Sequence, residues 1–256
     1  MNLKNNTILI TGGTSGLGLE FTRQLIALNN TIIVTGRNQA RLDEIKKQFP
    51  TVHTFQSDVS DPTAISELFQ KVIKQFPNLN MLINNAGVMR KINLHDSSND
   101  LENISTEIEI NLTGPIRMIQ QFLPHFKKQK NAVIVNVTSA LALIPFPISP
   151  IYGATKAGLR SYTKSLRVQL KNTSIKVFEL IPPAAKTPLN DKFANDVDTK
   201  SLMDTGKLVA IAIKGLENDK LEIYPGLANV LRIMSRLAPA FFLKQLSKPV
   251  DKMLNS

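Results

Sequence analysis

Residues 7–26 read TILITGGTSGLGLEFTRQLI, and this stretch decides the fold. Thr7 to Thr11 is a short β-branched run that is apolar on both faces, which predicts a buried strand. Leu19 to Ile26 has the apolar period of a helix, and a glycine-rich turn joins the two. This order is typical of a dinucleotide site, because glycines let the backbone approach a pyrophosphate and the helix N-terminus faces its charge. The alternative is a plain tight turn; no Gly-Lys-Ser/Thr follows, so the turn is not a phosphate-binding loop of that type.

Strand-like and helix-like segments alternate along the rest of the chain. The further expected strands are Thr31–Thr35, His53–Gln56, Met81–Ile83, Ala132–Val137, Ile175–Leu180 and Leu221–Ile223. The expected helices between them include Gln39–Phe49, Pro62–Phe76 and Glu107–Lys127. The alternation predicts an α/β, doubly wound fold, with a parallel sheet, helices on both faces and right-handed crossovers. No repeat, linker or low-complexity tract appears, so we expect one domain over residues 1–256, with a helical tail at about 227–256.

The composition narrows the class of protein. A chain of 256 residues that is 43% hydrophobic can bury a large core. It contains no cysteine, which excludes disulfides and thiolate metal sites. Residues 1–6 lead straight into a strand and lack the apolar core of a signal peptide, and no apolar run is long enough for a membrane span. We therefore expect a cytoplasmic location.

The net charge of +11 raises the question of a nucleic-acid partner. The lysines and arginines are scattered over nearly every expected helix, form no tight run, and are accompanied by few aromatic residues. We therefore expect no nucleic-acid partner; an anionic cofactor and solubility account for part of the excess charge. The histidines, His53, His95 and His125, share no metal-binding spacing, so no metal site is expected.

Tyr152 and Lys156 are four residues apart in a segment that reads as a helix. Ser149 and Pro150 look like its N-cap and first position, which would place Tyr152 in the first turns. This spacing puts the phenol and the ammonium on one face. A cation beside a phenol favours the phenolate, so we expect Lys156 to lower the pKa of Tyr152 from its usual value of about 10. Alone the pair is a weak signal.

Together these features resemble the short-chain dehydrogenase/reductase family over roughly residues 5–190. The matching motifs, in order and spacing, are Thr11–Gly18 (Thr-Gly-x-x-x-Gly-x-Gly), Asn84-Asn85-Ala86-Gly87, Asn111, Ser139 and Tyr152-x-x-x-Lys156. The resemblance implies a seven-stranded Rossmann sheet of order 3-2-1-4-5-6-7, with the ligand at the switch point. It also implies an NADP-type oxidoreductase that transfers hydride between NADP(H) and a carbonyl or alcohol.

The resemblance assigns roles to residues of this chain. Its implied catalytic residues are Asn111, Ser139, Tyr152 and Lys156. Tyr152 would give the proton, Ser139 would hold the substrate oxygen, Lys156 would serve the phenol and the nicotinamide ribose, and Asn111 would kink its helix and hold a water on a proton route. Thr138 is the competing hydroxyl. Its implied cofactor-binding residues are Gly12, Thr14, Ser15, Gly16, Leu17, Gly18, Arg37, Asp58, Val59, Asn85, Ala86, Gly87, Tyr152, Lys156, Pro182 and Thr187.

The choice between NAD and NADP depends on the end of the second strand. Gly36 stands where NAD-type members carry Asp, and Arg37 follows. A carboxylate would repel a 2′-phosphate, whereas arginine can pair with it bidentately, helped by hydrogen bonds from Ser15 and Asn38. This favours NADP; the alternative is a solvated surface arginine. One departure is Pro183, where the family commonly has glycine, which puts the contact near the nicotinamide in doubt.

The substrate is not predicted by the sequence, because it depends on residues 88–100, residues 188–201 and the tail. A non-catalytic NADP-binding regulator is the alternative function. In the tail, residues 227–237 and 239–250 look like basic amphipathic helices, which can lie on an anionic membrane. A lid or an oligomer contact is the favoured alternative. The resemblance also implies a homodimer or homotetramer that pairs the helices Glu107–Lys127 and Tyr152–Lys171.

Overall fold

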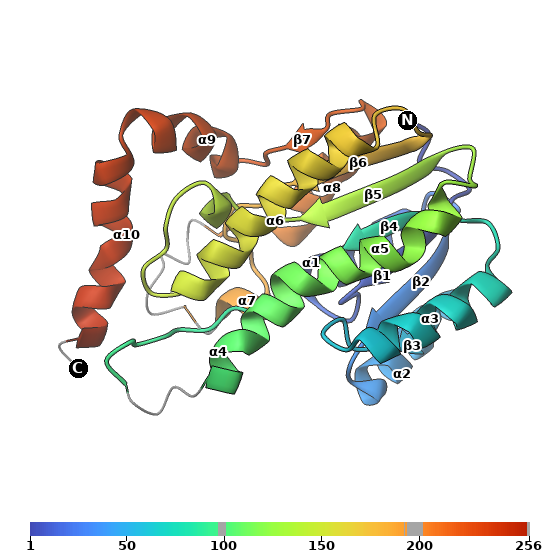
Figure 1. The fold of residues 1–256 in the computed structure, drawn as a ribbon, viewed down its shortest axis with the longest axis horizontal. Helices are drawn as coiled ribbons and strands as arrows, with labels where there is room; N and C mark the ends of the chain where they lie inside the picture. The colour runs from blue at the N-terminus through green and yellow to red at the C-terminus, as the bar shows by residue number, and fades with distance from the viewer. Residues whose placement is uncertain (97–100, 192, 194–201, 255–256) are drawn as a thin grey trace.

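The computed structural model describes residues 1–96, 101–191, 193 and 202–254. Its centre is one parallel sheet of order β3-β2-β1-β4-β5-β6-β7 (Figure 1), which confirms the predicted strand order. The strands are β1 (Thr7–Thr11), β2 (Thr31–Gly36), β3 (His53–Gln56), β4 (Leu79–Asn84), β5 (Ala132–Val137), β6 (Ile175–Leu180) and β7 (Glu222–Ile223). The order reverses between β1 and β4, which opens a crevice at their carboxyl ends.

Helices cover both faces of the sheet, as the alternating pattern predicted. One face carries α1 (Gly16–Ile26), α2 (Gln39–Gln48) and α8 (Thr205–Glu217), and the other carries α3 (Pro62–Gln75), α5 (Gly114–Phe126) and α6 (Pro150–Gln169). Shorter elements lie around the crevice: α4 (Leu101–Ile108), a π-helical segment at Glu109–Thr113, a 3₁₀ turn at Ala140–Ala142 and α7 (Pro188–Asp191). The tail forms α9 (Leu227–Leu237) and α10 (Pro239–Leu254).

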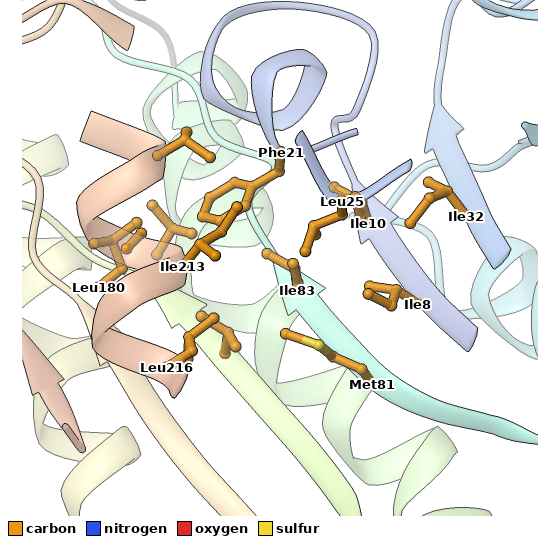
Figure 2. Packing of buried hydrophobic residues seen from close by; sticks show 14 of the residues in the cluster. Ile8, Ile10, Phe21, Leu25, Ile32, Met81, Ile83, Leu180, Ile213 and Leu216 are labelled. Carbon is orange, nitrogen blue, oxygen red and sulfur yellow. The ribbon is translucent and has the colours of Figure 1, made fainter. Parts of the chain in front are cut away.

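The core is split into two layers by the alternation of side chains along the strands. Ile8 and Ile10 of β1 point toward α1 and α8, where they meet Phe21 and Ile213 (Figure 2). Leu9, between them, belongs to the opposite layer with α3 and α5. Because both of their faces are buried, the central strands β1, β2 and β5 read as nearly continuous apolar runs, and their carboxyl ends are held at fixed positions; the edge strand β3 is only partly buried.

Several predicted boundaries need correction. The segment predicted as one helix, Glu107–Lys127, is two α-helices joined by the π segment, and it begins at Leu101. Strand β4 starts at Leu79, two residues early, because Thr7 of β1 pairs with Leu79. Strand β7 lacks the expected Leu221, and α10 continues four residues past Val250.

The two tail helices lie at one end of the molecule, beyond the carboxyl end of β5 (Figure 1). Leu231 of α9 packs against Ala140 and Ile181, which follow β5 and β6. Leu246, Val250 and Met253 of α10 pack against a cluster that contains Phe146 and Tyr152. Within the described ranges, no helix has both the length and the apolar character that a bilayer span requires.

Candidate functional site

A cavity of about 990 Å³ lies at the carboxyl ends of the strands. It is lined by the glycine turn, the end of β2, the turn after β4, the 3₁₀ turn after β5, the start of α6 and the segment after β6. It thus brings together every predicted site residue except two, Gly18 and Asn111, which lie behind its wall. Since these segments are far apart in the sequence, only the parallel sheet brings them to one place.

The glycine turn has the backbone that its sequence requires. Gly12 and Gly16 have φ angles of 63° and 53°, the left-handed region that favours glycine. A Cβ at Gly18 would lie 2.3 Å from the carbonyl oxygen of Gly12, so only glycine lets α1 start this close to the turn. The role of Gly18 is therefore packing of the turn, while its neighbours line the cavity.

The turn after β4 braces the glycine turn. The Asn85 side-chain amide donates to the carbonyl oxygens of Thr11 and Gly12, each at 3.1 Å. The Thr11 hydroxyl accepts from the backbone amides of Asn85 and Ala86 at 3.0 and 3.1 Å. Asn85 therefore fixes the shape of the glycine turn, and Ala86 and Gly87 line the cavity beside it.

Arg37 stands at the cavity edge, 58% exposed, with its guanidinium 3.7 Å from the Asp58 carboxylate. Gly36 leaves space there, although a Cβ on it would approach the Thr14 methyl to 3.3 Å. Arg41 also lines this part of the cavity, and sequence reasoning missed it. The sequence feature that could have identified Arg41 is its place in the first turn of α2, four residues after Arg37.

Side chains near this corner also hold the backbone in place. The Asp58 carboxylate accepts from the amide and the hydroxyl of Ser60 at 2.9 and 2.7 Å. Asp61 caps α3 by accepting from the Thr63 amide. Asn38 caps α2 through its side-chain oxygen, so that oxygen is already used, and only its amide NH₂ remains to meet a ligand.

Tyr152 and Lys156 lie in the first two turns of α6 and line the same side of the cavity. The Lys156 ammonium lies 5.7 Å from the Tyr152 ring centroid and donates to the Val137 carbonyl at 2.9 Å. Burial raises the pKa of Tyr152 to about 12; a hydrogen bond with Ser139 opposes this, and Glu107 adds to it. Burial lowers the pKa of Lys156 to about 8. The expected lowering of the Tyr152 pKa is therefore wrong for this structure, because burial of the phenol disfavours its charged form and raises the pKa.

The start of α6 also differs from its predicted cap. Ser149 and Pro150 occupy the N-cap and first positions as expected, but the Ser149 hydroxyl caps nothing. It donates instead to the Arg90 carbonyl at 2.6 Å. This bond links the start of α6 to the segment after β4. It therefore helps to fix the position of the first turn of α6, which carries Tyr152.

The Ser139 hydroxyl faces the cavity and Thr138 does not compete with it. Ser139 begins the 3₁₀ turn, accepts from the Leu141 amide at 3.1 Å and forms a hydrogen bond that lowers the pKa of Tyr152. The Thr138 hydroxyl is used elsewhere, because it donates to the buried Glu179 carboxylate at 2.8 Å. The structure thus supports the choice of Ser139 over Thr138.

Asn111 lies in the π segment and is fully buried, so it is not a solvated surface residue of its helix. Its side chain closes two hydrogen bonds with the backbone of Val88, accepting at 2.9 Å and donating at 2.8 Å. It also donates to the Thr155 hydroxyl at 3.3 Å. Asn111 therefore joins the helix of Tyr152 and Lys156 to the turn after β4.

Glu107 is a buried carboxylate that sequence reasoning missed. It has no exposed surface, accepts from the Arg90 amide at 3.0 Å, and lies 3.7 Å from the Arg90 guanidinium. Burial raises its pKa. Nothing in the local sequence marks this glutamate as buried, because its partner Arg90 comes from the segment after β4.

Thr187 and Pro182 line the cavity on the side of β6. The Pro182 carbonyl accepts from the Ala140 amide at 2.8 Å, which joins the turns after β5 and β6. Thr187 is largely buried, and its methyl lies 3.3 Å from the position of a Cβ on Gly16. Pro183, which stands where the family commonly has glycine, lines the cavity beside Pro182.

Large apolar side chains form a further part of the wall, and they were not predicted residue by residue. They come from the segment after β4, the stretch before α6 and the tail: Met89, Leu141, Phe146, Leu227, Leu231 and Leu246. Part of the predicted substrate-determining loops, residues 97–100 and 194–201, lies outside the described residues. No group of three or more histidine, aspartate or glutamate side chains in the described part of the chain is arranged to hold a metal ion.

Comparison with known proteins agrees with this geometry. The family described as short chain dehydrogenase matches residues 6–198. The chain is 42% identical over 224 residues to the uncharacterized oxidoreductase DltE of Bacillus subtilis, covering 87% of this chain and 89% of that protein. It is 32% identical over 177 residues to the NADP-dependent 3-hydroxy acid dehydrogenase YdfG of Escherichia coli K12, covering 68% and 71%. A short chain dehydrogenase from Burkholderia cenocepacia, solved with NADP, superposes with a TM-score of 0.83 at 21% identity, covering 96% and 99%. The sheet order and helix layers of this chain thus match that fold, and the chain belongs to the short-chain dehydrogenase/reductase family of oxidoreductases.

Proposed function

We propose that the protein is an NADP-dependent carbonyl reductase or alcohol dehydrogenase. The observation that carries the proposal is that one cavity is lined by the glycine turn, by Arg37, and by Ser139, Tyr152 and Lys156. A site for binding alone would need the first two features and no buried hydroxyl group beside an amine. The NADP dependence of the relative from Escherichia coli supports the choice of cofactor.

The cavity fits a dinucleotide phosphate. The left-handed glycines expose backbone amides at the start of α1, where a pyrophosphate would be held. Arg37 and Arg41 would hold the 2′-phosphate, and Asp58 and Val59 the adenine. Lys156 would bind the nicotinamide ribose, with Thr187 and Pro182 near the carboxamide. When bound, the cofactor supplies the hydride for the carbonyl carbon.

The chain's own groups handle the proton. The raised pKa keeps the Tyr152 phenol protonated at neutral pH, so in the reductive direction it can donate its proton to the carbonyl oxygen. The Ser139 hydroxyl would hold that oxygen by a hydrogen bond as charge develops on it. Lys156, charged below a pH of about 8, would stabilise the phenolate that remains. Asn111 would act as a positioning residue through its bonds to Val88 and Thr155.

The apolar wall indicates the kind of substrate. Met89, Leu141 and Phe146 face the cavity from the body, and Leu231 and Leu246 face it from the tail. Removing apolar area from water contributes about 25 cal/mol per Å², so such a wall favours a carbonyl compound with an apolar substituent over a sugar or a charged acid. We propose this as the substrate class.

The first test is NADPH oxidation across a panel of ketones, aldehydes and quinones with apolar groups of increasing size. Tyr152→Phe should abolish turnover and leave NADPH binding near the wild-type level, because the phenol acts on the proton alone. Tyr162→Phe, at a half-buried tyrosine of the same helix outside the cavity, is the matched control and should keep its activity. Substantial reduction by Tyr152→Phe would contradict the proton role, and no turnover by the wild type would favour the NADP-binding regulator.

The second test addresses the cofactor. Arg37→Ala should weaken NADPH binding by about 1.5–3 kcal/mol through loss of a charge-assisted contact, and should leave NADH binding unchanged. The exposed pair with Asp58 contributes little to stability, so the fold should persist. Arg23→Ala, at an exposed arginine of α1 outside the cavity, is the control. Equal binding of NADH and NADPH by the wild type would contradict the assignment.

Three further expectations stay predictions: a single domain over residues 1–256, a cytoplasmic location, and a symmetric dimer or tetramer through α5 and α6. On these helices Ile119, Leu159, Leu166 and Leu170 are buried against the chain's own sheet. A partner would meet the remaining apolar side chains, among them the half-buried Leu112 and Tyr162.

A further inference from the structure

The tail helix α9 presents an apolar ridge to solvent. Val230, Ile233 and Leu237, at spacings of three and four residues, are 51%, 50% and 74% exposed, and Phe241 just beyond is 57% exposed. Ala228 is the one residue of this helix that is fully buried, so α9 shows much of its apolar surface on the outside. A stripe of this kind on a helix otherwise bound to the body marks a surface that meets an apolar environment.

A second, basic cavity of about 380 Å³ adjoins this ridge, between α6, β7 and α9. Ile233 and Leu237 form part of its wall, and four cationic side chains form another part: Arg160, Lys164, Arg232 and Arg236. Its one carboxylate, Glu222, is already close to three cations, Arg160 at 3.4 Å, Lys164 at 3.6 Å and Arg167 at 3.7 Å. The cavity therefore keeps a positive field that an anion of phosphate size would satisfy.

The cavity is held by a fixed framework. One guanidinium nitrogen of Arg160, Nη1, donates to both carboxylate oxygens of the buried Glu179 at 2.9 Å, and the other, Nη2, donates to the Tyr224 hydroxyl at 2.8 Å. The Arg232 guanidinium lies over the Tyr224 ring, 4.9 Å from its centroid. Because Arg160 and Tyr224 fix the floor, Lys164, Arg232 and Arg236 stand at the rim beside the apolar ridge.

Charge decides between the possible occupants of this face. Residues 227–256 contain one acidic side chain, Asp251, and five basic ones: Arg232, Arg236, Lys244, Lys248 and Lys252. A twofold contact between two copies of this face would bring these cations together with few carboxylates to balance them. An anionic bilayer offers phosphate groups to the cations and acyl chains to the ridge at once.

We propose that α9, the start of α10 and the basic cavity form a docking surface for an anionic lipid bilayer. A headgroup phosphate would enter the basic cavity while Ile233, Leu237 and Phe241 enter the boundary between headgroups and acyl chains. Leu227 and Leu231, on a different face of α9, line the large cavity. Docking would therefore set an apolar substrate site, lined in part by α9, next to the membrane surface.

Co-sedimentation with vesicles tests the proposal without any substrate, so its failure would leave the proposed reaction untouched. The wild type should bind vesicles of mixed phosphatidylglycerol and phosphatidylcholine, bind pure phosphatidylcholine weakly, and lose binding as salt rises. The double change Ile233→Ser and Leu237→Ser should weaken binding at least about tenfold. Each of Arg236→Gln and Lys244→Gln should weaken it about fivefold. None of these side chains lines the large cavity, so NADPH binding should not change.

Matched controls distinguish docking through this surface from a general effect of surface charge or surface hydrophobicity on vesicle binding. Val168→Ser removes an equally exposed apolar side chain (66%) from α6, and Lys71→Gln removes an exposed lysine from α3; neither should alter vesicle binding. Binding that is equal for all variants, or equal on neutral and anionic vesicles, would overturn the proposal. Light scattering that shows a dimer which Leu237→Ser dissociates, together with absent vesicle binding, would overturn it in favour of a second copy as the occupant.

Discussion

Lys156 offers a sharp test of how this site is built, because its amine is buried and its pKa is lowered from 10.5 to about 8. In the unfolded chain the same amine keeps its ordinary pKa. Between pH 8 and 10.5 the unfolded state therefore binds more protons than the folded state, and the free energy of unfolding must rise with pH in that window. The perturbation is a change of pH alone, in the protein without cofactor.

The magnitude follows from the two pKa values. Over the whole window the gain in the free energy of unfolding approaches about 3 kcal/mol. Between about pH 7.5 and about pH 9.5 this gain amounts to about 2 kcal/mol. The gain ends near pH 10, because the pKa of Tyr152 is raised from 10.0 to about 12. Above its ordinary pKa the phenol is protonated in the folded state alone, and this lowers stability as pH rises further.

Urea unfolding at a series of pH values measures the effect. The wild type should gain about 2 kcal/mol across the interval, whereas Lys156→Met, which removes the titration, should lack that part of the rise. Lys71→Met, at an exposed lysine, should follow the wild type. Parallel curves for the wild type and Lys156→Met would refute the reasoning, since they would mean that the buried amine does not titrate in this range.

Three further changes test the packing of the site and its assembly. Glu179→Gln should destabilise the protein by about 3 kcal/mol in urea unfolding, because it removes the buried carboxylate that pairs with Arg160. Glu67→Gln, which breaks an exposed pair, should lower the free energy of unfolding by less than about 0.5 kcal/mol. Gly18→Ala should weaken NADPH binding at least about tenfold by calorimetry, since its Cβ would collide with the Gly12 carbonyl; unchanged binding would mean that the turn relaxes. Size-exclusion chromatography with light scattering should show a dimer or tetramer, and a monomeric mass would exclude the contact through α5 and α6.

The arrangement of the sheet was predictable because the central strands are short, largely apolar runs bounded by turn residues. The bounds of β3, β5 and β6 match those expected from the sequence, and the strand order follows the family resemblance. The long helix before β5 was harder, since a π segment depends on how Asn111 meets Val88 and Thr155. Helical period alone cannot show such a contact.

The residues of the candidate site could be predicted from the sequence, but their pKa shifts could not. The motifs identified Ser139, Tyr152 and Lys156, which the fold brings to one cavity wall. The direction of the Tyr152 pKa shift was wrong, because spacing on a helix shows proximity to a cation but not the degree of burial. Glu107 was missed for the same reason: its burial is produced by segments distant in the sequence.

The π segment at Glu109–Thr113 has a consequence for insertions and deletions in this chain. A wide turn holds one residue more than an α-helical turn, so the helix before and the helix after it are set about 100° apart in phase. Deleting one residue there would let a continuous α-helix form, yet either Glu107 would turn away from Arg90 or the core residues of α5 would turn away from the sheet. Chain length at this point is therefore fixed by two surfaces at once, and we expect natural variants to differ here in residue type and not in residue number.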